Sequence, residues 1–220
     1  MTKKSNIGGD FLWGFILLLW IVMLVVPASR TTFLSITGAH PYLGGFFKFA
    51  ILASMGDLLG GRILNKQWVI PQGFIFKAIL WGLLGMAISL VFFVYSGGVS
   101  YAQGAGKLPF ANVAFATAFF TSFIMNTTFG PMLFIFHKFG DLFIDAKIEK
   151  KGHSVKELVS RVDWQTMVGF SWLKTQTFVW IPCHTVVFLL PQEYRVLASA
   201  FLSIVLGILV AISKMKSAKK

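Results

Sequence analysis

Charged residues are scarce in this chain of 220 residues. They make up 13% of it, and only 8 are acidic, whereas about a quarter of the residues in a soluble globular domain are charged. Hydrophobic residues make up 56%, and several apolar runs approach or exceed the roughly 20 residues that a helix needs to cross a bilayer. The composition therefore predicts an integral membrane protein of the all-α class, built as a polytopic helical bundle.

The chain also lacks the short motifs of common catalytic and nucleotide-binding sites. It has no Gly-x-Ser-x-Gly, His-Glu-x-x-His, Gly-x-Gly-x-x-Gly or P-loop pattern, and no pair of side chains suggests a catalytic dyad. Its one cysteine, Cys183, excludes an intramolecular disulfide. His184 follows it directly, but adjacent residues point to different sides of a helix, and no second pair stands at ligand spacing. We therefore expect no enzymatic activity, no cofactor and no metal site.

Basic residues outnumber acidic ones by 20 to 8, which gives a net charge of +12. Such an excess can indicate nucleic-acid binding, but the chain has no basic recognition motif with interleaved aromatic residues. In a chain this apolar, Lys and Arg flank the membrane spans on the cytoplasmic side. We therefore expect anionic lipid headgroups, and no nucleic acid, as partners of the basic residues.

Six apolar segments divide the chain, without a clear internal repeat. They cover residues 11–27, 42–64, 74–96, 109–136, 167–190 and 194–213. The first is at the lower edge of spanning length, so a bundle of five membrane segments is an alternative, and a bundle of four is a second alternative. In either case residues 1–220 form a single integral-membrane domain.

The distribution of basic residues predicts the topology. With six spans, fifteen Lys and Arg lie on the side of the two termini, and only Arg30, Lys107 and Arg195 lie on the other. The positive-inside rule then places both termini in the cytosol or its topological equivalent. The fifteen include Lys3, Lys4, Lys219 and Lys220 at the ends of the chain.

The stretch 137–166 is the only extended polar region, and we interpret it as a loop. Within it, Ser154-Val-Lys-Glu157 is typical of a capping box that opens a short helix. This helix would be amphipathic, with Val155, Leu158, Val159 and Val162 on one face. We expect it to lie along the membrane surface with its basic residues toward anionic headgroups, and a solvated connector is the alternative.

Small residues recur at helical spacing in two of the segments. Gly56 and Gly60 form a Gly-x-x-x-Gly pattern, and the last segment carries Ser199, Ser203, Gly207 and Ala211 at intervals of four. Lipid provides no hydrophobic drive for helix association, so membrane helices use small residues to approach closely. These faces therefore predict close packing within the bundle, with formation of a homo-oligomer as the alternative.

Polar side chains inside the apolar segments carry the functional prediction. The candidates are Asp57, Asn126, Lys174, Gln176 and His184. Ionisable groups at bilayer depth are costly and usually face a bundle interior or a water-filled cavity. Lys174 and His184 share a helical stripe with Thr177 and Ile181, and Asp57 is a candidate counter-ion for Lys174 or Lys48.

The polar set predicts a channel or pore-like facilitator for small solutes. In the alternative interpretation, the charges form buried pairs that fix helix register, and the protein is a non-conducting membrane scaffold or a lipid-binding protein. Pro131 and Pro182 each remove a helical hydrogen bond, and Gly130 adds freedom beside the first of them. We expect kinks there, with Gly130-Pro131 as a hinge.

The stretch from Trp180 to Arg195 resembles a known family signature. Trp180, Pro182, Phe188, Pro191 and Arg195 fit the C-terminal W-x-P-x5-F-x2-P-x3-R frame of the Mpv-seventeen and 22-kDa peroxisomal membrane protein family. Gly130-Pro131 followed by His137 and Asp141 or Asp145, and the pair Gly56-Asp57, are similar to two further stretches of that family. The family's usual aromatic pair is replaced here by His137-Lys138, its asparagine by Val187, and the tryptophan of its last helix is missing.

The resemblance implies a small multi-pass protein of the mitochondrial inner or peroxisomal membrane, in a family usually drawn with four spans. Some members are described as weakly selective channels. Because the pattern departs from the family at several positions, we expect a divergent, bacterial member in the cytoplasmic membrane, with the two organellar membranes as alternatives.

Overall fold

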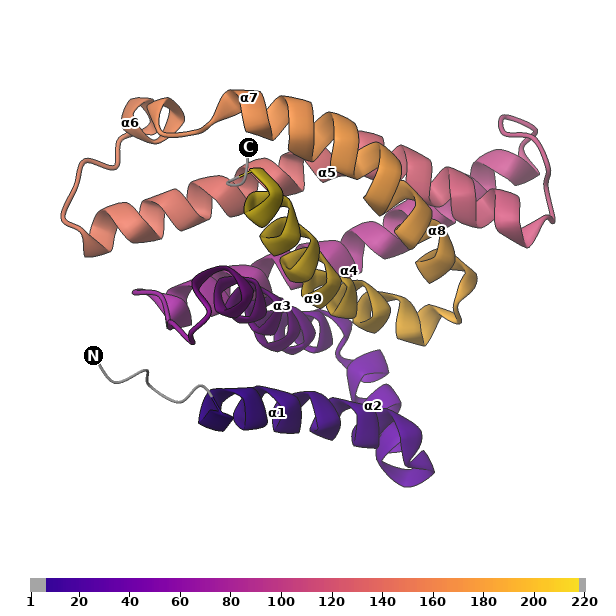
Figure 1. Cartoon of the computed structure of the whole chain (residues 1–220). Helices are drawn as coiled ribbons and strands as arrows, with labels where there is room; N and C mark the ends of the chain where they lie inside the picture. Colours follow the sequence, from indigo (N-terminus) through magenta and orange to yellow (C-terminus); the bar gives the residue numbers. More distant parts are fainter. Residues whose placement is uncertain (1–6, 218–220) are drawn as a thin grey trace.

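The structure is a computed structural model that describes residues 7–217, and most of these residues are helical (Figure 1). The helices are α1 (Ile7–Val25), α2 (Pro27–Ala39), α3 (Pro41–Asn65), α4 (Phe74–Gly104), α5 (Ala114–Ile148), α6 (Val155–Ser160), α7 (Trp164–Thr166), the π-helix η1 (Met167–Trp180), α8 (Ile181–Leu189) and α9 (Gln192–Ser217). The predicted all-α class is confirmed. Lys3, Lys4, Lys219 and Lys220, used in the topology prediction, lie outside the described residues.

Five of the described helices are long and apolar enough to cross a membrane: α1, α3, α4, α5 and α9. This makes the chain a multi-pass membrane bundle. The predicted segment 167–190 is not among them, because it is divided between η1 and α8. The two run on without a break, so the structure matches five single helices plus one composite helix rather than six equal spans.

Helix α3 is the centre of the packing, with α4 along one side and α9 along another. A Cβ atom on Gly56 would meet the backbone oxygen of Ser203, and one on Gly207 would meet the backbone oxygen of Gly56. The backbones of α3 and α9 therefore touch at the predicted Gly-x-x-x-Gly face, which confirms close packing within the bundle. Within one chain, these two small-residue faces cover each other.

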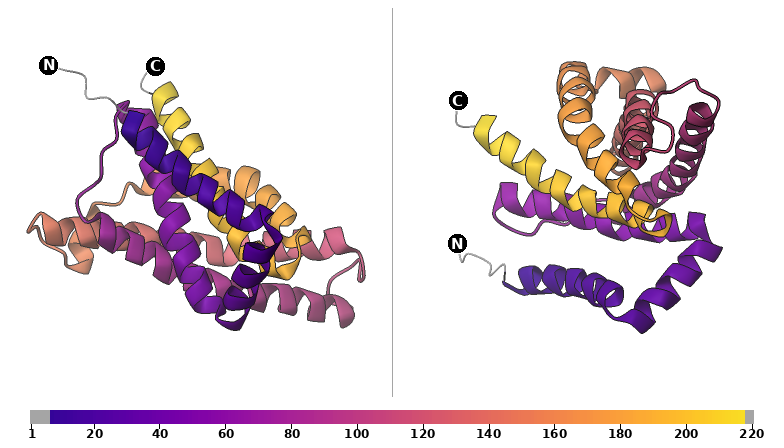
Figure 2. Two further views of the ribbon diagram at one scale, coloured as in Figure 1. Left: turned by 90° about the horizontal axis from the view of Figure 1, so that it is seen from below. Right: turned by 90° about the vertical axis from the view of Figure 1, so that its right-hand side faces the viewer.

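Helix α5 and the α7–η1–α8 segment form a layer on one side of α3, α4 and α9, and α1 and α2 lie on the other side (Figure 1). Helix α5 packs against α4, η1 and α8. Figure 2 shows that α1 begins and α9 ends on the same side of the molecule. This is the relation between the chain ends that the charge distribution predicts.

Helix α1 is attached to the bundle by polar contacts at defined points. The Trp13 indole nitrogen donates to the backbone oxygen of Met55 at 3.0 Å. One turn earlier in α1, Asp10 forms an ion pair with Arg62 at 3.0 Å and accepts a hydrogen bond from Trp68 at 2.9 Å. The start of α1 thus lies beside the end of α3, so the two helices run in opposite directions.

The prediction that 137–166 is a loop is wrong for its first part. Helix α5 continues to Ile148, because its polar end forms ion pairs instead of leaving the helix. Lys77 Nζ lies 2.8 Å from Asp145, and His137 Nε2 lies 3.7 Å from Asp141 one turn further along α5. Only the stretch after Ile148 connects α5 to the short helix α6.

The predicted capping box is present at the start of α6. The Glu157 backbone nitrogen donates to Ser154 Oγ at 3.4 Å, and the Ser154 backbone nitrogen donates to Glu157 Oε2 at 2.9 Å. Hydrogen bonds from the Ser154 side chain and backbone hold the pKa of Glu157 below its usual range. Leu158 is buried whereas Val155 is exposed, so the predicted apolar face is only partly covered.

The contact between α3 and α9 can be tested with Gly207→Ala. The added methyl group would overlap the carbonyl of Gly56, so the two helices must separate, at a cost of about 1–3 kcal/mol in the free energy of unfolding. Gly97→Ala in α4 is the matched control, since a Cβ there meets nothing nearby. Unfolding in mixed micelles should show the loss for Gly207→Ala alone. Equal stability of the two variants would contradict the close contact.

Candidate functional site

Four of the five predicted polar-path residues line one cavity, the central cavity, near the middle of the bundle. Asp57 comes from α3, Asn126 from α5, Gln176 from η1 and His184 from α8. The cavity has a volume of about 150 Å³ and is otherwise mostly lined by apolar and aromatic side chains. Such a space has room for a few water molecules beside these polar groups.

His184 is the centre of a buried hydrogen-bond network. Its Nδ1 lies 3.2 Å from Asn126 Oδ1, and its Nε2 lies 3.2 Å from the Ser199 hydroxyl. An amide oxygen only accepts hydrogen bonds, so Nδ1 carries a proton, and Nε2 can accept from Ser199. The ring stacks on Trp180 at 5.3 Å and meets Phe92 edge-on at 5.7 Å. A neutral imidazole therefore has all its polar atoms satisfied.

Asn126, on α5, also connects this histidine to η1. Its Nδ2 donates to the backbone oxygen of Ser122 at 2.8 Å, and Gln176 Nε2 donates to the Asn126 backbone oxygen at 2.9 Å. The Ser122 hydroxyl donates to the backbone oxygen of Ile181 at 2.7 Å, where η1 gives way to α8. These two side chains, one from each partner, thus hold the composite helix of η1 and α8 against α5.

A series of contacts runs from Asp57, at the central cavity, toward the end of α5. The Trp81 indole nitrogen donates to Asp57 Oδ2 at 2.8 Å, and the Trp81 ring lies against the His137 ring at 4.1 Å. His137 is in turn paired with Asp141. His137, which we placed in a loop from the sequence, is in α5 and lines the central cavity.

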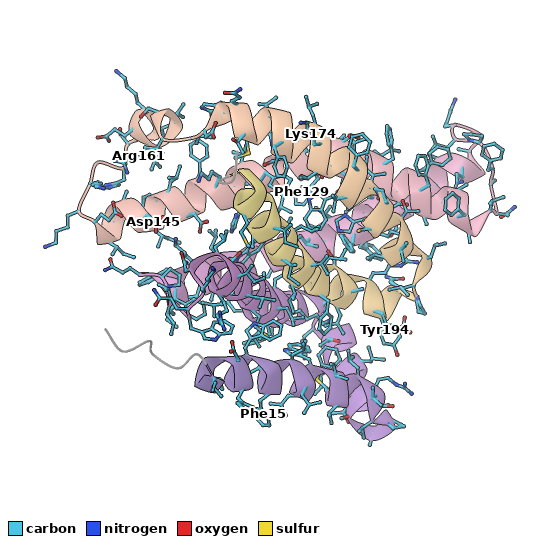
Figure 3. All side chains as sticks on the ribbon, viewed as in Figure 1. Phe15, Phe129, Asp145, Arg161, Lys174 and Tyr194 are labelled. Carbon is cyan, nitrogen blue, oxygen red and sulfur yellow. The ribbon has the colours of Figure 1, made fainter. Side chains whose placement is uncertain are left out.

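Lys174 does not join this site. It is exposed on η1 at the edge of the bundle (Figure 3) and has no ion pair with Asp57. The prediction assumed the turn of an α-helix, but η1 is a π-helix, whose hydrogen bonds join residues five apart. The changed turn leaves Lys174 and Thr177 exposed while Gln176 is buried.

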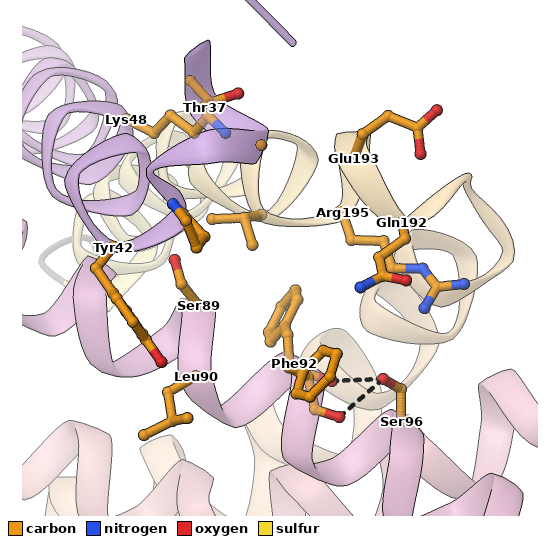
Figure 4. Close-up of a pocket in the computed structure, with 14 residues that line it drawn as sticks. Thr37, Tyr42, Lys48, Ser89, Leu90, Phe92, Ser96, Gln192, Glu193 and Arg195 are labelled. Atoms are coloured by element: carbon orange, nitrogen blue, oxygen red, sulfur yellow. Dashed lines mark hydrogen bonds between the residues drawn. The ribbon is translucent and has the colours of Figure 1, made fainter. Parts of the chain in front are cut away.

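Lys48 lies in a different place, the outer cavity, formed by the start of α3, the middle of α4 and the start of α9 (Figure 4). This cavity has a volume of about 530 Å³ and is also lined by Arg195, Gln192 and Glu193. Lys48 is only 4% exposed, and its nearest polar interaction is with the face of the Phe33 ring, at 5.1 Å from Nζ to the centroid. It is not the partner of Asp57.

A third space, the inner cavity, lies beside Asp57 and has a volume of about 250 Å³. It is lined by Ser54, Asn65 and Lys77 and reaches the connector 66–73. Asp57 lines both the central and the inner cavity, and Phe92 lines both the outer and the central cavity. The three cavities therefore follow one another through the bundle.

Phe92 separates the outer and central cavities. It is 5% exposed, and its ring contacts His184 and, at 4.9 Å, Phe188. An aromatic residue in an apolar segment gave no sequence signal for this role. Trp81 was missed for the same reason, whereas the spacing of His137 and Asp141, four residues apart, was visible in the sequence.

Three residues of the family-like signature, Phe188, Pro191 and Arg195, meet where α8 turns into α9. The Arg195 guanidinium lies over the Phe188 ring at 5.8 Å, and Arg195 Nε donates to the backbone oxygen of Leu190 at 2.9 Å. Pro191 forms the turn, because the Tyr194 backbone nitrogen donates to its oxygen at 3.0 Å. Glu193 and Arg195 are near in sequence but form no ion pair within the described residues.

The two prolines occupy different positions. Pro131 lies inside α5, and Pro182 lies in the first turn of α8, inside the composite helix that α8 forms with η1, so each removes a backbone donor from a helix. The helix changes from π to α at Ile181, directly before Pro182. A Cβ atom on Gly130 would overlap the Gln176 amide, so this glycine makes room for a hydrogen-bonding side chain beside the hinge candidate.

Comparison of the chain with protein-family models, with curated proteins and with solved structures finds no match. The resemblance to the Mpv-seventeen family therefore stays a prediction. Among residues 7–217, no group of three or more His, Cys, Asp or Glu side chains is arranged to hold a metal ion.

The His184 network can be tested with Asn126→Leu. This change removes the acceptor of His184 Nδ1 and leaves a buried donor unpaired, which costs about 1–3 kcal/mol in the free energy of unfolding. Thr127→Val is the control, because the exposed Thr127 hydroxyl bonds only to its own helix. Thermal unfolding in detergent should separate the two variants. An Asn126→Leu protein as stable as the control would show that the network contributes nothing.

Proposed function

We propose that this protein is a pore-like facilitator for small solutes, which pass along the outer, central and inner cavities. The observation that carries the proposal is the shared lining of successive cavities, through Phe92 and then Asp57. The outer cavity lies at the α8–α9 turn and the inner cavity at the connector between α3 and α4, which are opposite ends of the bundle.

Phe92 acts as the gate in this proposal. Its buried ring fills the space between the outer and central cavities, so a solute passes only when the ring moves aside. Gly130, Pro131 and the change of helix type at Ile181 are close to the central cavity and provide backbone freedom for such a movement. The small central cavity limits passage to small solutes.

The position of Asp57 also supports the facilitator over a non-conducting scaffold. The ion pairs that join helices, Arg62–Asp10 and Lys77–Asp145, lie at helix ends, and Asp57 is not part of them. Within the described residues, Asp57 has a hydrogen bond from Trp81 and no ion pair, and it borders two cavities. A carboxylate placed in this way suits contact with water and passing solutes.

Flux through proteoliposomes tests the proposal. Phe92→Ala removes the ring between two cavities, so we expect solute efflux to rise by about tenfold or more, which corresponds to about 1.4 kcal/mol from the barrier. Phe76→Ala, in the same helix and 62% exposed, is the matched control and should leave efflux unchanged. If the wild type and Phe92→Ala are both folded and neither passes solute, the facilitator is refuted. The scaffold or lipid-binding protein then remains.

A further inference from the structure

The outer cavity contains a cation without a partner. Lys48 is 4% exposed and, within the described part of the chain, takes part in no hydrogen bond or ion pair. A charged ammonium in a membrane segment is costly unless it is paired or hydrated. The Phe33 ring, 5.1 Å away, compensates only a small part of that cost. The rest is left to what fills the cavity, which is water or a ligand.

A second cation borders the same cavity. Arg195 is held in place by its Nε, which donates to the Leu190 carbonyl, and by the Phe188 ring beneath its guanidinium. These contacts leave its two terminal nitrogens without a hydrogen bond in the described structure. The neighbouring Gln192 amide also lines the cavity. Figure 4 shows Lys48 entering from α3 and Arg195 and Gln192 from α9, on different sides of the cavity.

The other groups around the cavity do not neutralise these cations. Glu193 is the one acidic residue in the lining, it forms no ion pair with either cation, and its carboxylate points outward in Figure 4. The Ser89 and Ser96 hydroxyls donate to backbone oxygens of their own helix. The remaining wall is largely apolar, with Phe92 and Leu90 from α4.

We propose that the outer cavity binds an oxyanion, the carboxylate or phosphate group of a small organic molecule, between Lys48 and Arg195. The ammonium supplies three donors, and the guanidinium supplies the planar pair of donors that matches a carboxylate or phosphate. The apolar part of the ligand lies against Phe92 and Leu90. A volume of about 530 Å³ is within the range of small-molecule sites.

This inference deepens the proposed function, because the outer cavity is one end of the solute path and the oxyanion names the class of solute. Binding can nevertheless be measured without transport. The same chemistry is offered by a soluble acid and by the phosphate of an anionic lipid, so the experiment needs one arm for each.

The test uses the full chain purified in neutral detergent. Thermal unfolding is followed with benzoate, with inorganic phosphate and with glucose as the neutral control, all at one ionic strength set with chloride. A second arm titrates phosphatidylglycerol into the micelles. We expect a saturable rise in the unfolding temperature with an oxyanion and none with glucose, because only a ligand of the folded state stabilises it.

Two variants assign the effect to the cavity. Lys48→Gln and Arg195→Gln should each weaken oxyanion binding by about tenfold or more, as expected for loss of a charge-assisted hydrogen bond. Lys174→Gln is the matched control, because that lysine is exposed on η1, and its binding should equal that of wild type. Lys48→Gln also removes a buried charge, so it should fold and permit the comparison.

Stabilisation by a soluble oxyanion that depends on Lys48 supports the site with a free solute. Stabilisation by phosphatidylglycerol alone, again dependent on Lys48, supports the site with a lipid headgroup. Equal oxyanion binding in wild type and Lys48→Gln overturns the proposal, as does no binding in either arm. If solute still crosses proteoliposomes in those two cases, the facilitator stands; if an oxyanion binds but nothing crosses, the site stands without the facilitator.

Discussion

Hydrocarbon offers no hydrogen-bond partners, and the arrangement of this bundle follows from that constraint. A polar side chain in an apolar helix therefore bonds to its own backbone, finds a partner in another helix or faces a cavity. His184 illustrates the first solution, because Asn126 and Ser199 satisfy both of its ring nitrogens. Asp57 illustrates a mixture of the two, with one hydrogen bond from Trp81 and an open side toward two cavities. Lys48 has neither an open surface nor, among the described residues, a hydrogen-bond or ion-pair partner, so the outer cavity holds an uncompensated buried cation.

Tight packing and cavities occur together around α3. Toward α9, Gly56 and Gly207 let the two backbones touch. Toward α4, Gly45 and Gly85 make a second close contact, because a Cβ atom on either would overlap the backbone oxygen of the other. Between these contacts, aromatic rings and polar side chains leave gaps, and Phe92 lines two of them. The π-helix η1 and Pro131 lie in the layer on the far side of α3 from α1 and α2 (Figure 1).

The sequence predicted the helical class, the Gly56 contact and most of the site, because each leaves a local signal. Asp57, Asn126, Gln176 and His184 are polar residues in apolar segments, and all four meet at one cavity. The position of Lys174 was predicted wrongly, because the predicted stripe assumes α-helical turns. No local sequence pattern indicates a π-helix here. His137 was missed because ion pairs extend α5 beyond the apolar run. Phe92 could not be found, since its role comes from which rings surround it and not from its own chemistry.

The central claim is that polar side chains of this bundle face a common wet interior, and thiol accessibility tests it most directly. With Cys183 replaced by serine, single cysteines would be placed at Ser96, Ser203 and Ser54, which line the outer, central and inner cavities. Val205, on the exposed side of α9, is the lipid-facing control. The account predicts that a small, water-soluble thiol reagent modifies the three cavity positions in liposomes, with Ser96 and Ser54 reached from opposite sides, and spares Val205. Protection of all three cavity positions would contradict it.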